Sequence, residues 1–316
     1  MLLSRVAERV YWQARYLERV ENTARLLSVY STLLMDLPKG TKLGWHTLVQ
    51  ITGTEAAFDK RYKQPSERNV IRFLLSERNG NSILDYLALA RENARTTREV
   101  MPTECFELIN DLYYRAKDHA QEAISRGPRH NLLEGIIANC QQINGLLAGC
   151  MSRDEAYSFV RLGRSLERAD MTTRIVDAGT SDLLSPIESM KTGQEDGGPF
   201  ENILWMNVLR SQSAYQMYRQ HVRERIRGED VVRFLLQDEK FPRAAAHNLT
   251  TLTKVLQKLP NSGKVKWQVD KTRRLVRNQD IQQLLNKGLL RYIDDLQQEL
   301  AAVHFRIANT WFLPVK

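Results

Sequence analysis

The chain has 316 residues, a net charge of +9, 42% hydrophobic residues and 26% charged residues, a balance that supports a sizeable core. Glycine and proline are too sparse for an all-β protein of this length. Three cysteines without a CxxC pair argue against a disulfide framework or a zinc knuckle. No stretch approaches the roughly 18 uncharged apolar residues of a membrane span, and the N-terminus lacks the features of a signal peptide. We therefore expect a cytoplasmic protein without membrane insertion.

Helical hydrophobic periodicity extends along almost the whole chain. In a first long helix, over residues 3–34, Val6, Val10, Leu17 and Val20 recur at three-, four- and seven-residue spacing. Later stretches predict further helices over residues 67–77, 82–100, 103–125, 130–151, 153–178, 200–227, 229–239, 243–258 and 279–311.

Two local signals within this pattern predict a helix start and a long loop. Ser152, with Glu155 three residues later, predicts a capping box at the start of the helix over 153–178. Residues 179–199 are rich in glycine, serine, proline and acidic residues, which predicts a long mobile loop.

The sequence also repeats itself. Residues 14–27 (ARYLERVENTARLL) align with residues 163–176 (GRSLERADMTTRIV), and two weaker matches follow in the same order, 45–48 with 205–208 and 70–77 with 231–238. The chain is therefore predicted to be a single all-α domain over 1–316, a multi-helix bundle of two duplicated halves (about 1–151 and 152–316) with pseudo-two-fold character. The positions shared by the main repeat are Arg15/Arg164, Leu17/Leu166, Glu18/Glu167, Arg19/Arg168, Glu21/Asp170, Thr23/Thr172 and Arg25/Arg174, whereas Asn22 is replaced by Met171.

The repeated residues carry most of the candidate chemistry. On a helical wheel, Arg15, Glu18, Arg19 and Asn22 share one face of the first helix, and the sequence places Arg–carboxylate pairs three and four residues apart in both copies. Three interpretations remain open: a solvated face, a structural Arg–carboxylate network that docks the halves, or a cleft that binds carboxylate or phosphate groups. The candidate ligand-binding, partner-binding or organising residues are Arg15, Glu18, Arg19, Arg25, Arg164, Glu167, Arg168 and Arg174.

Several segments resemble the Alpha-E family, which is named for its α-helical fold and Glu-Arg motif. They are YLERVENTAR (16–25), ARENAR (90–95), SRDEAYSFVRLGRSLERADMTTRIVD (152–177) and FLLQDEKFPRA (234–244), and the resemblance covers nearly the whole chain. It implies association with an ATP-grasp-type ligase and transglutaminase-like proteins in a peptide-bond-forming or peptide-modifying system.

The sequence offers few signs of catalysis. The six histidines form no metal-ligand spacing, and there is no phosphate-binding loop, dinucleotide fingerprint or nucleophile elbow, so no metal or cofactor is expected. Flanking arginines would keep Glu18 and Glu167 ionised, which suits structure or binding better than proton donation. Whether the chain is an enzyme stays open.

A second charged feature lies near the C-terminus. Eight basic residues, with Trp267 among them, lie between positions 254 and 277, as in nucleic-acid-binding surfaces. A solvated loop and helix face is the simpler interpretation, because no nucleic-acid-binding module surrounds the stretch.

Three functions are therefore carried forward. The preferred one is an accessory or partner-binding helical protein of an ATP-grasp-type system that uses the duplicated Arg/Glu face. The first alternative is an enzyme whose Glu-Arg motifs line one charged cleft, and the second is nucleic-acid binding through residues 254–277. The sequence does not predict the oligomeric state.

Overall fold

The computed structural model describes residues 2–36, 44–187, 199–286 and 288–313. Every regular element in these ranges is helical, so the predicted all-α class is confirmed. Up to residue 151 the α-helices are α1 (Ser4–Asp36), α2 (His46–Ile51), α3 (Glu55–Asp59), α4 (Glu67–Leu75), α5 (Ile83–Arg95), α6 (Thr103–His119) and α7 (Arg126–Cys150). They are followed by α8 (Glu155–Ile187), α9 (Pro199–Ser211), α10 (Tyr215–His221), α11 (Gly228–Gln237), α12 (Ala245–Leu256), α13 (Gly263–Arg277), α14 (Ile281–Asn286) and α15 (Leu289–Ile307). Short turns η1 (Arg98–Val100), η2 (Glu122–Ile124) and η3 (Ala308–Phe312) complete the described elements.

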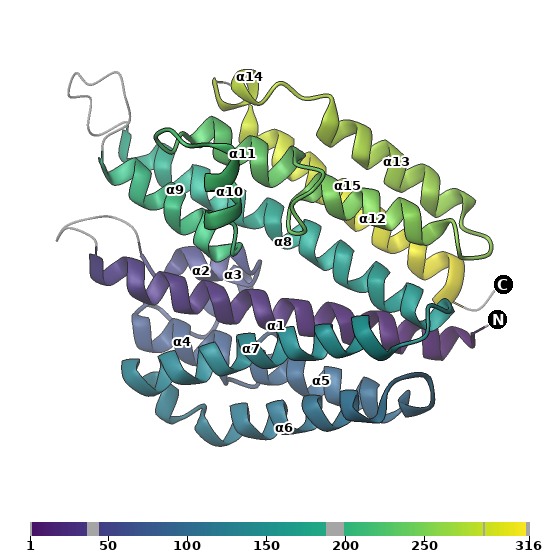
Figure 1. Cartoon of the computed structure of the whole chain (residues 1–316). Coiled ribbons are helices and arrows are strands. Elements are labelled where there is room, and N and C mark those ends of the chain that lie inside the picture. Colours follow the sequence, from purple (N-terminus) through teal and green to yellow (C-terminus); the bar gives the residue numbers. More distant parts are fainter. Residues whose placement is uncertain (1, 37–43, 188–198, 287, 314–316) are drawn as a thin grey trace.

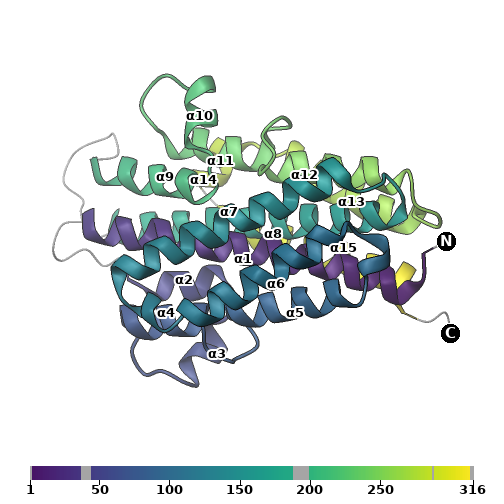
Figure 2. The same cartoon turned by 60° about the horizontal axis from the view of Figure 1, so that its bottom comes forward.

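Two long helices, α1 and α8, run side by side in the same direction through the centre of the molecule (Figures 1 and 2). On one side α1 packs against α5 and α7, and α6 packs against both of these. On the other side α8 packs against α12 and α15, and α13 packs against both of these. The chain thus places one group of helices on each side of the central pair (Figure 1).

The central position of α1 explains its sequence. In the apolar stripe, Val10, Leu17, Val20 and Leu27 are buried, as the periodicity predicts, whereas Val6 near the start of the helix is half-buried. Most of the polar residues between them are also buried, because α5, α7 and α8 surround the helix, and Arg19 is half-buried. This burial brings charged side chains into the interior, where they need partners.

Several predicted boundaries were wrong for local reasons. The helix predicted over 200–227 is divided into α9 and α10, because Ser213 adopts φ 50° and ends α9. Gly288, at φ 107°, separates α14 from α15 within the helix predicted over 279–311. The short helices α2 and α3 and the basic helix α13 were not predicted as elements.

The two local signals around α8 also need correction. The side chain of Asp154 accepts the main-chain N–H of Tyr157 at 3.0 Å, so Asp154 caps α8 and the predicted capping box of Ser152 and Glu155 does not form. Residues 179–187 of the predicted mobile loop belong to α8, and 188–198 lie outside the described residues.

Candidate functional site

A small residue sets the distance between α1 and α8. A side chain at Gly163 would overlap the carbonyl oxygen of Tyr11, and its Cβ would lie 3.3 Å from the Cβ of Ala14. Glycine therefore allows a close approach that a larger residue would prevent. Ala14 and Gly163 are aligned positions of the repeat, and the Glu-Arg motifs follow about one turn further along.

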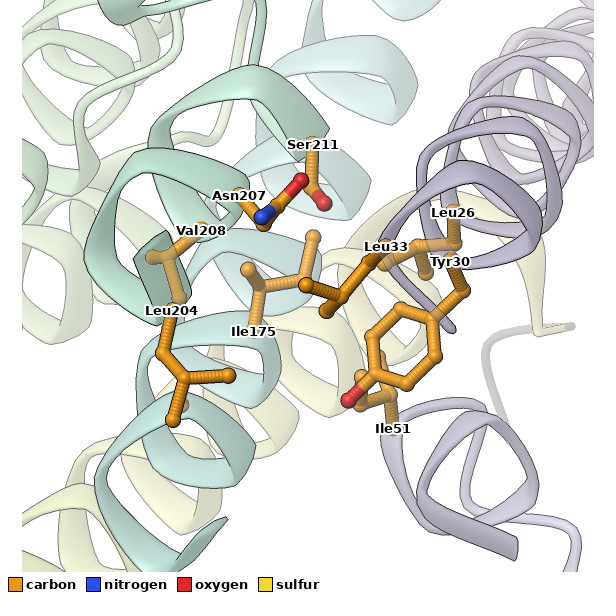
Figure 3. A pocket seen from close by; sticks show the side chains of 10 residues that line it. Leu26, Tyr30, Leu33, Ile51, Ile175, Leu204, Asn207, Val208 and Ser211 are labelled. Atoms are coloured by element: carbon orange, nitrogen blue, oxygen red, sulfur yellow. The ribbon is translucent and has the colours of Figure 1, made fainter. Parts of the chain in front are cut away.

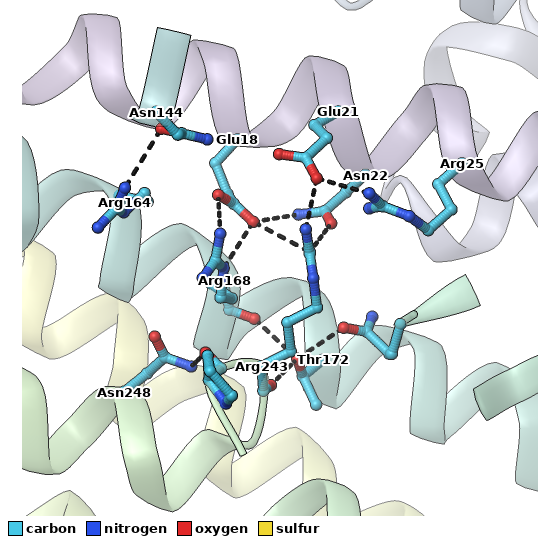
Figure 4. A network of polar contacts seen from close by, with 12 residues as sticks. Glu18, Glu21, Asn22, Arg25, Asn144, Arg164, Arg168, Thr172, Arg243 and Asn248 are labelled. Carbon is cyan, nitrogen blue, oxygen red and sulfur yellow. Dashed lines mark hydrogen bonds and ion pairs between the residues drawn. The ribbon is translucent and has the colours of Figure 1, made fainter. Parts of the chain in front are cut away.

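The two Glu-Arg motifs exchange ion pairs between the central helices. Glu18 of α1 accepts two hydrogen bonds from Arg168 of α8, from Nε to Oε1 at 2.8 Å and from Nη2 to Oε2 at 2.7 Å (Figure 4). Glu167 of α8 accepts two from Arg19 of α1, from Nε to Oε1 at 2.5 Å and from Nη2 to Oε2 at 3.0 Å. Both are bidentate, charge-assisted pairs, the strongest class of side-chain hydrogen bond. The motifs therefore tie α1 to α8 reciprocally.

Arg243, from the segment before α12, extends the network beside Glu18 (Figure 4). Its Nη1 lies 2.8 Å from Asn22 Oδ1 and 3.2 Å from Glu18 Oε1. Its Nη2 lies 2.5 Å from Glu21 Oε1, which also accepts a bond from Arg25 at 2.5 Å. One guanidinium thus contacts three side chains of α1.

The carboxylates of the two Glu-Arg motifs, Glu18 and Glu167, are ionised. Glu18 and Glu167 are each only 1% exposed. Burial alone would raise the pKa of both, but the adjacent guanidiniums outweigh it and hold the pKa of Glu18 well below its ordinary value and that of Glu167 at about 2. Burial lowers the pKa of Arg243 to about 10, so that residue remains protonated at neutral pH.

The predicted pairs within each helix form only in part. Arg25 bonds Glu21 and Arg174 bonds Asp170 four residues away, as the spacing predicts. Arg15 does not pair with Glu18. Its Nε donates to Glu167 Oε2 at 2.6 Å across the interface instead.

Arg164 departs most from the expected pattern. It bonds the Asn144 side-chain oxygen at 3.3 Å and has no carboxylate partner among the described residues. Burial and the neighbouring Arg168 lower its pKa.

A solvated face is the wrong interpretation for the Glu-Arg motifs, because their carboxylates lie inside the protein.

One end of the network reaches a pocket, which we call the α1–α8 pocket. Its volume is about 200 Å³. The Arg19 side chain remains 25% exposed there and lies over the ring of Tyr86, with 4.9 Å from the guanidinium carbon to the ring centroid. The lining residues are Arg19, Thr23, Thr52, Gly53, Thr54, Asn81, Tyr86, Glu167, Asp170, Met171 and Arg174. Polar groups of both signs thus surround a space larger than one water molecule requires.

Three of the eight candidate residues line the pocket. Arg19, Glu167 and Arg174 line it, whereas Glu18 and Arg168 lie in the network and do not. The two Glu-Arg pairs therefore do not line one common pocket, as the enzyme alternative requires.

No sequence pattern pointed to Arg243, or to the pocket wall formed by the α2–α3 turn and the residues just before α5. Arg243 lies within FLLQDEKFPRA (234–244), a segment that carried the family resemblance, but it is distant in sequence from its partners. Thr52, Gly53 and Asn81 are turn residues of the first half, and nothing in their local sequence places them beside α8.

A second pocket follows α1 and α8 further along (Figure 3). Leu26, Leu33, Ile175 and Leu204 line it, and its volume is about 20 Å³. This is room for about one water molecule, so it reflects slightly loose packing among apolar side chains.

The remaining sequence candidates lie apart from the network. Cys140 is buried and Cys150 is exposed. The basic stretch continues from α12 into helix α13, where Lys271 pairs with Glu299 and Arg277 with Glu239. No group of metal-ligating side chains was found in the described part of the chain, and no helix there is long and apolar enough to cross a membrane.

A family model, described as a predicted alpha-helical domain with a conserved ER motif, matches residues 2–312. The chain belongs to the Alpha-E family. In this Alpha-E protein the dipeptides Glu18-Arg19 and Glu167-Arg168 are the motifs that exchange ion pairs at the centre of the fold. Comparisons with curated proteins and with solved structures gave no match.

Proposed function

We propose that this Alpha-E protein is a cytosolic, non-catalytic binding component of an ATP-grasp-type peptide-ligating or peptide-modifying system. The buried Arg/Glu network organises its fold, and the α1–α8 pocket is its contact site. The observation that carries this proposal is that the Arg19–Glu167 pair lines a polar pocket in which Arg19 remains 25% exposed, while the Glu18–Arg168 pair is covered by Arg243.

Binding fits the pocket better than proton transfer does. The pKa of Glu167 is about 2, because Arg19 and Arg15 overcome the effect of burial, so this carboxyl is a poor proton donor or acceptor near neutral pH. Its two arginines hold it in one orientation. A fixed, ionised group of this kind is suited to recognition.

We further propose that the whole chain is one unit of two duplicated halves. The support is topological: α5 and α7 pack against α1 and α6 packs against both, just as α12 and α15 pack against α8 and α13 packs against both. The turn after α2 and the turn after α9 also match. Gly53 and Ser213 have φ of 66° and 50°, and each turn closes with the same two main-chain hydrogen bonds, Thr54 to Val49 and Gly53 to Gln50 in one, and Ala214 to Leu209 and Ser213 to Arg210 in the other.

The proposed partners, an ATP-grasp-type ligase and a transglutaminase-like protein, come from the family resemblance. The test is direct mixing of this protein with each purified partner from the same cell, with the affinity measured by calorimetry. Arg174→Gln should weaken a complex at least about tenfold, a loss of about 1.4 kcal/mol, because Arg174 is 32% exposed in the pocket.

Arg233→Gln is the matched control. Arg233 also pairs with a carboxylate four residues away, Glu229, but on α11 and outside the pocket. Its loss should leave the affinity unchanged. Equal affinity for both variants would reject the pocket as the contact site, and no complex with either purified partner would reject the accessory function.

A further inference from the structure

The walls that α1 and α8 contribute to the α1–α8 pocket correspond to the surroundings of Arg243 on the opposite side of the central helix pair. Addition of 149 to a residue number of the first repeat gives its partner in the second. Six lining residues of the pocket are related in this way to six residues at or near Arg243. The pairs are Arg19/Arg168, Thr23/Thr172, Glu167/Glu18, Asp170/Glu21, Met171/Asn22 and Arg174/Arg25.

The segments that approach the two sides correspond as well. Arg243 lies two residues before the first residue of α12, and Asn81 lies two residues before the first residue of α5. Asn81 lines the pocket, but its side chain is much shorter than that of arginine and bonds locally, to Asn79 and Tyr86. The Arg243 guanidinium therefore fills the space beside Glu18 and Glu21, whereas the corresponding space beside Glu167 and Asp170 is the pocket.

Hydrogen-bond acceptors in the pocket have unused capacity. Glu18 Oε1 accepts bonds from Arg168, Asn22 and Arg243, whereas Glu167 Oε1 accepts one, from Arg19, within the described residues. The two copies of the next carboxylate differ in the same way. Glu21 Oε1 accepts bonds from Arg25 and Arg243.

Asp170 is the counterpart of Glu21. Within the described residues its carboxylate accepts one side-chain hydrogen bond, from Arg174 Nε to Oδ2 at 2.9 Å, where Glu21 accepts two. A guanidinium placed between Glu167 Oε1 and Asp170 would thus reproduce the contacts that Arg243 makes with Glu18 and Glu21.

We propose that the α1–α8 pocket binds a guanidinium group supplied from outside the chain, either as an arginine side chain of a peptide or as a small guanidino compound. This inference rests on the proposed duplication and on the proposed role of the pocket, and it adds the chemistry of the ligand. The ligand takes the position that Arg243 occupies in the other half.

The pocket should select a guanidinium over an ammonium group. The planar guanidinium can donate to two carboxylates at once from a fixed fork, whereas an ammonium is a single charged centre. Arg15, Arg19 and Arg174 also lie at or beside the site. Their positive charge lowers the pKa of a cation bound beside them. An ammonium group would therefore tend to lose its proton in the pocket, whereas a guanidinium keeps its proton.

The binding test uses N-acetyl-arginine amide as the peptide-like probe and free arginine as the small-molecule probe, with calorimetry or NMR titration of the full chain. N-acetyl-citrulline amide, N-acetyl-lysine amide and inorganic phosphate are the comparison probes. A dissociation constant on the order of 1 mM or tighter is expected for the arginine probes, with at least about tenfold weaker binding of the comparison probes. The relative affinities of amide and free arginine then distinguish the two sources of the ligand.

Two variants connect binding to the site. Asp170→Asn should weaken binding of the arginine probe at least about tenfold, whereas Glu229→Gln, which removes the carboxylate of the matched pair on α11, should not. Asn81→Arg should supply the missing guanidinium from within the chain, raise the melting temperature and abolish binding of the probe. Asn131→Arg, the same substitution at an exposed position of α7, should do neither.

Equal binding of the citrulline probe, binding of phosphate in place of arginine, or no binding of either arginine probe would overturn the inference. These outcomes are separable from the partner test. A ligase complex that depends on Arg174 without guanidinium binding would overturn this inference alone. Guanidinium binding without any complex would overturn the accessory function alone.

Discussion

The two sides of the α1–α8 pair carry aligned residues but differ in what covers them. On the closed side, defined by Glu18, Glu21 and Arg168, the Arg243 guanidinium fills the space between the helices. On the open side, defined by Glu167, Asp170 and Arg19, the same space is a pocket. The comparison teaches that a sequence motif present twice in one chain can have two different surroundings, because a single side chain from elsewhere in the chain decides whether the space beside it is filled or open.

Acidification should affect both sides and have the largest effect. The folded-state pKa values of Glu18 and Glu167 are lowered, so the stability they contribute is fully present above their unfolded value of about 4.5 and is lost as the pH falls towards about 2. The loss should be on the order of 3 kcal/mol for each carboxylate. Urea titrations from pH 6 to pH 2.5 measure it, and a constant free energy of unfolding across this range would contradict the network.

Glu18→Gln should have the next largest effect. It leaves the buried guanidiniums of Arg168 and Arg243 without their shared carboxylate, at a cost of about 3–5 kcal/mol. Glu167→Gln should cost less, because one of the two arginine partners of Glu167, Arg19, can be solvated through the pocket, although Arg15 cannot. Chemical denaturation of both variants at pH 7 tests the difference, and an equal or reversed order would show that the two sides are not distinguished by access to water.

Arg243→Ala and Arg174→Ala compare the arginine side chains that lie beside Glu21 and Asp170. Removal of the Arg243 side chain should cost about 3 kcal/mol, because buried acceptors lose a charged donor. Removal of Arg174 should cost less than about 1 kcal/mol, because its pair is partly exposed. Thermal melts report both effects, and a large loss for Arg174→Ala would mean that the pocket is part of the structural core.

The class of fold could be predicted because helical periodicity is a local property. The stripe of Val10, Leu17 and Val20 identifies α1 without knowledge of its neighbours. Helix ends were harder to place, because Ser213 ends α9 with a positive φ that serine rarely adopts. Asp154 rather than Ser152 caps α8 because the helix begins at Glu155, a boundary that the local pattern places within a few residues only.

The site was predictable in its members but not in its connections. The repeat identified Glu18, Arg19, Glu167 and Arg168 as a group. It could not show that each glutamate pairs with the arginine of the other copy, because that depends on the register of α1 against α8 set at Gly163. Spacing within one helix instead suggested pairs such as Arg15 with Glu18. In the structure Arg15 pairs with Glu167 of α8, because α1 is buried against that helix.

A double-mutant cycle of Glu18→Gln and Arg168→Gln tests the central claim that the two motifs dock the helices by exchanging ion pairs. The cycle of Arg15→Gln and Glu18→Gln within α1 is the control, with free energies of unfolding measured by urea titration at pH 7. We expect a coupling energy of at least about 1.5 kcal/mol between Glu18 and Arg168 and less than about 0.5 kcal/mol between Arg15 and Glu18. A negligible coupling across the helices, with the larger value inside α1, would contradict the account.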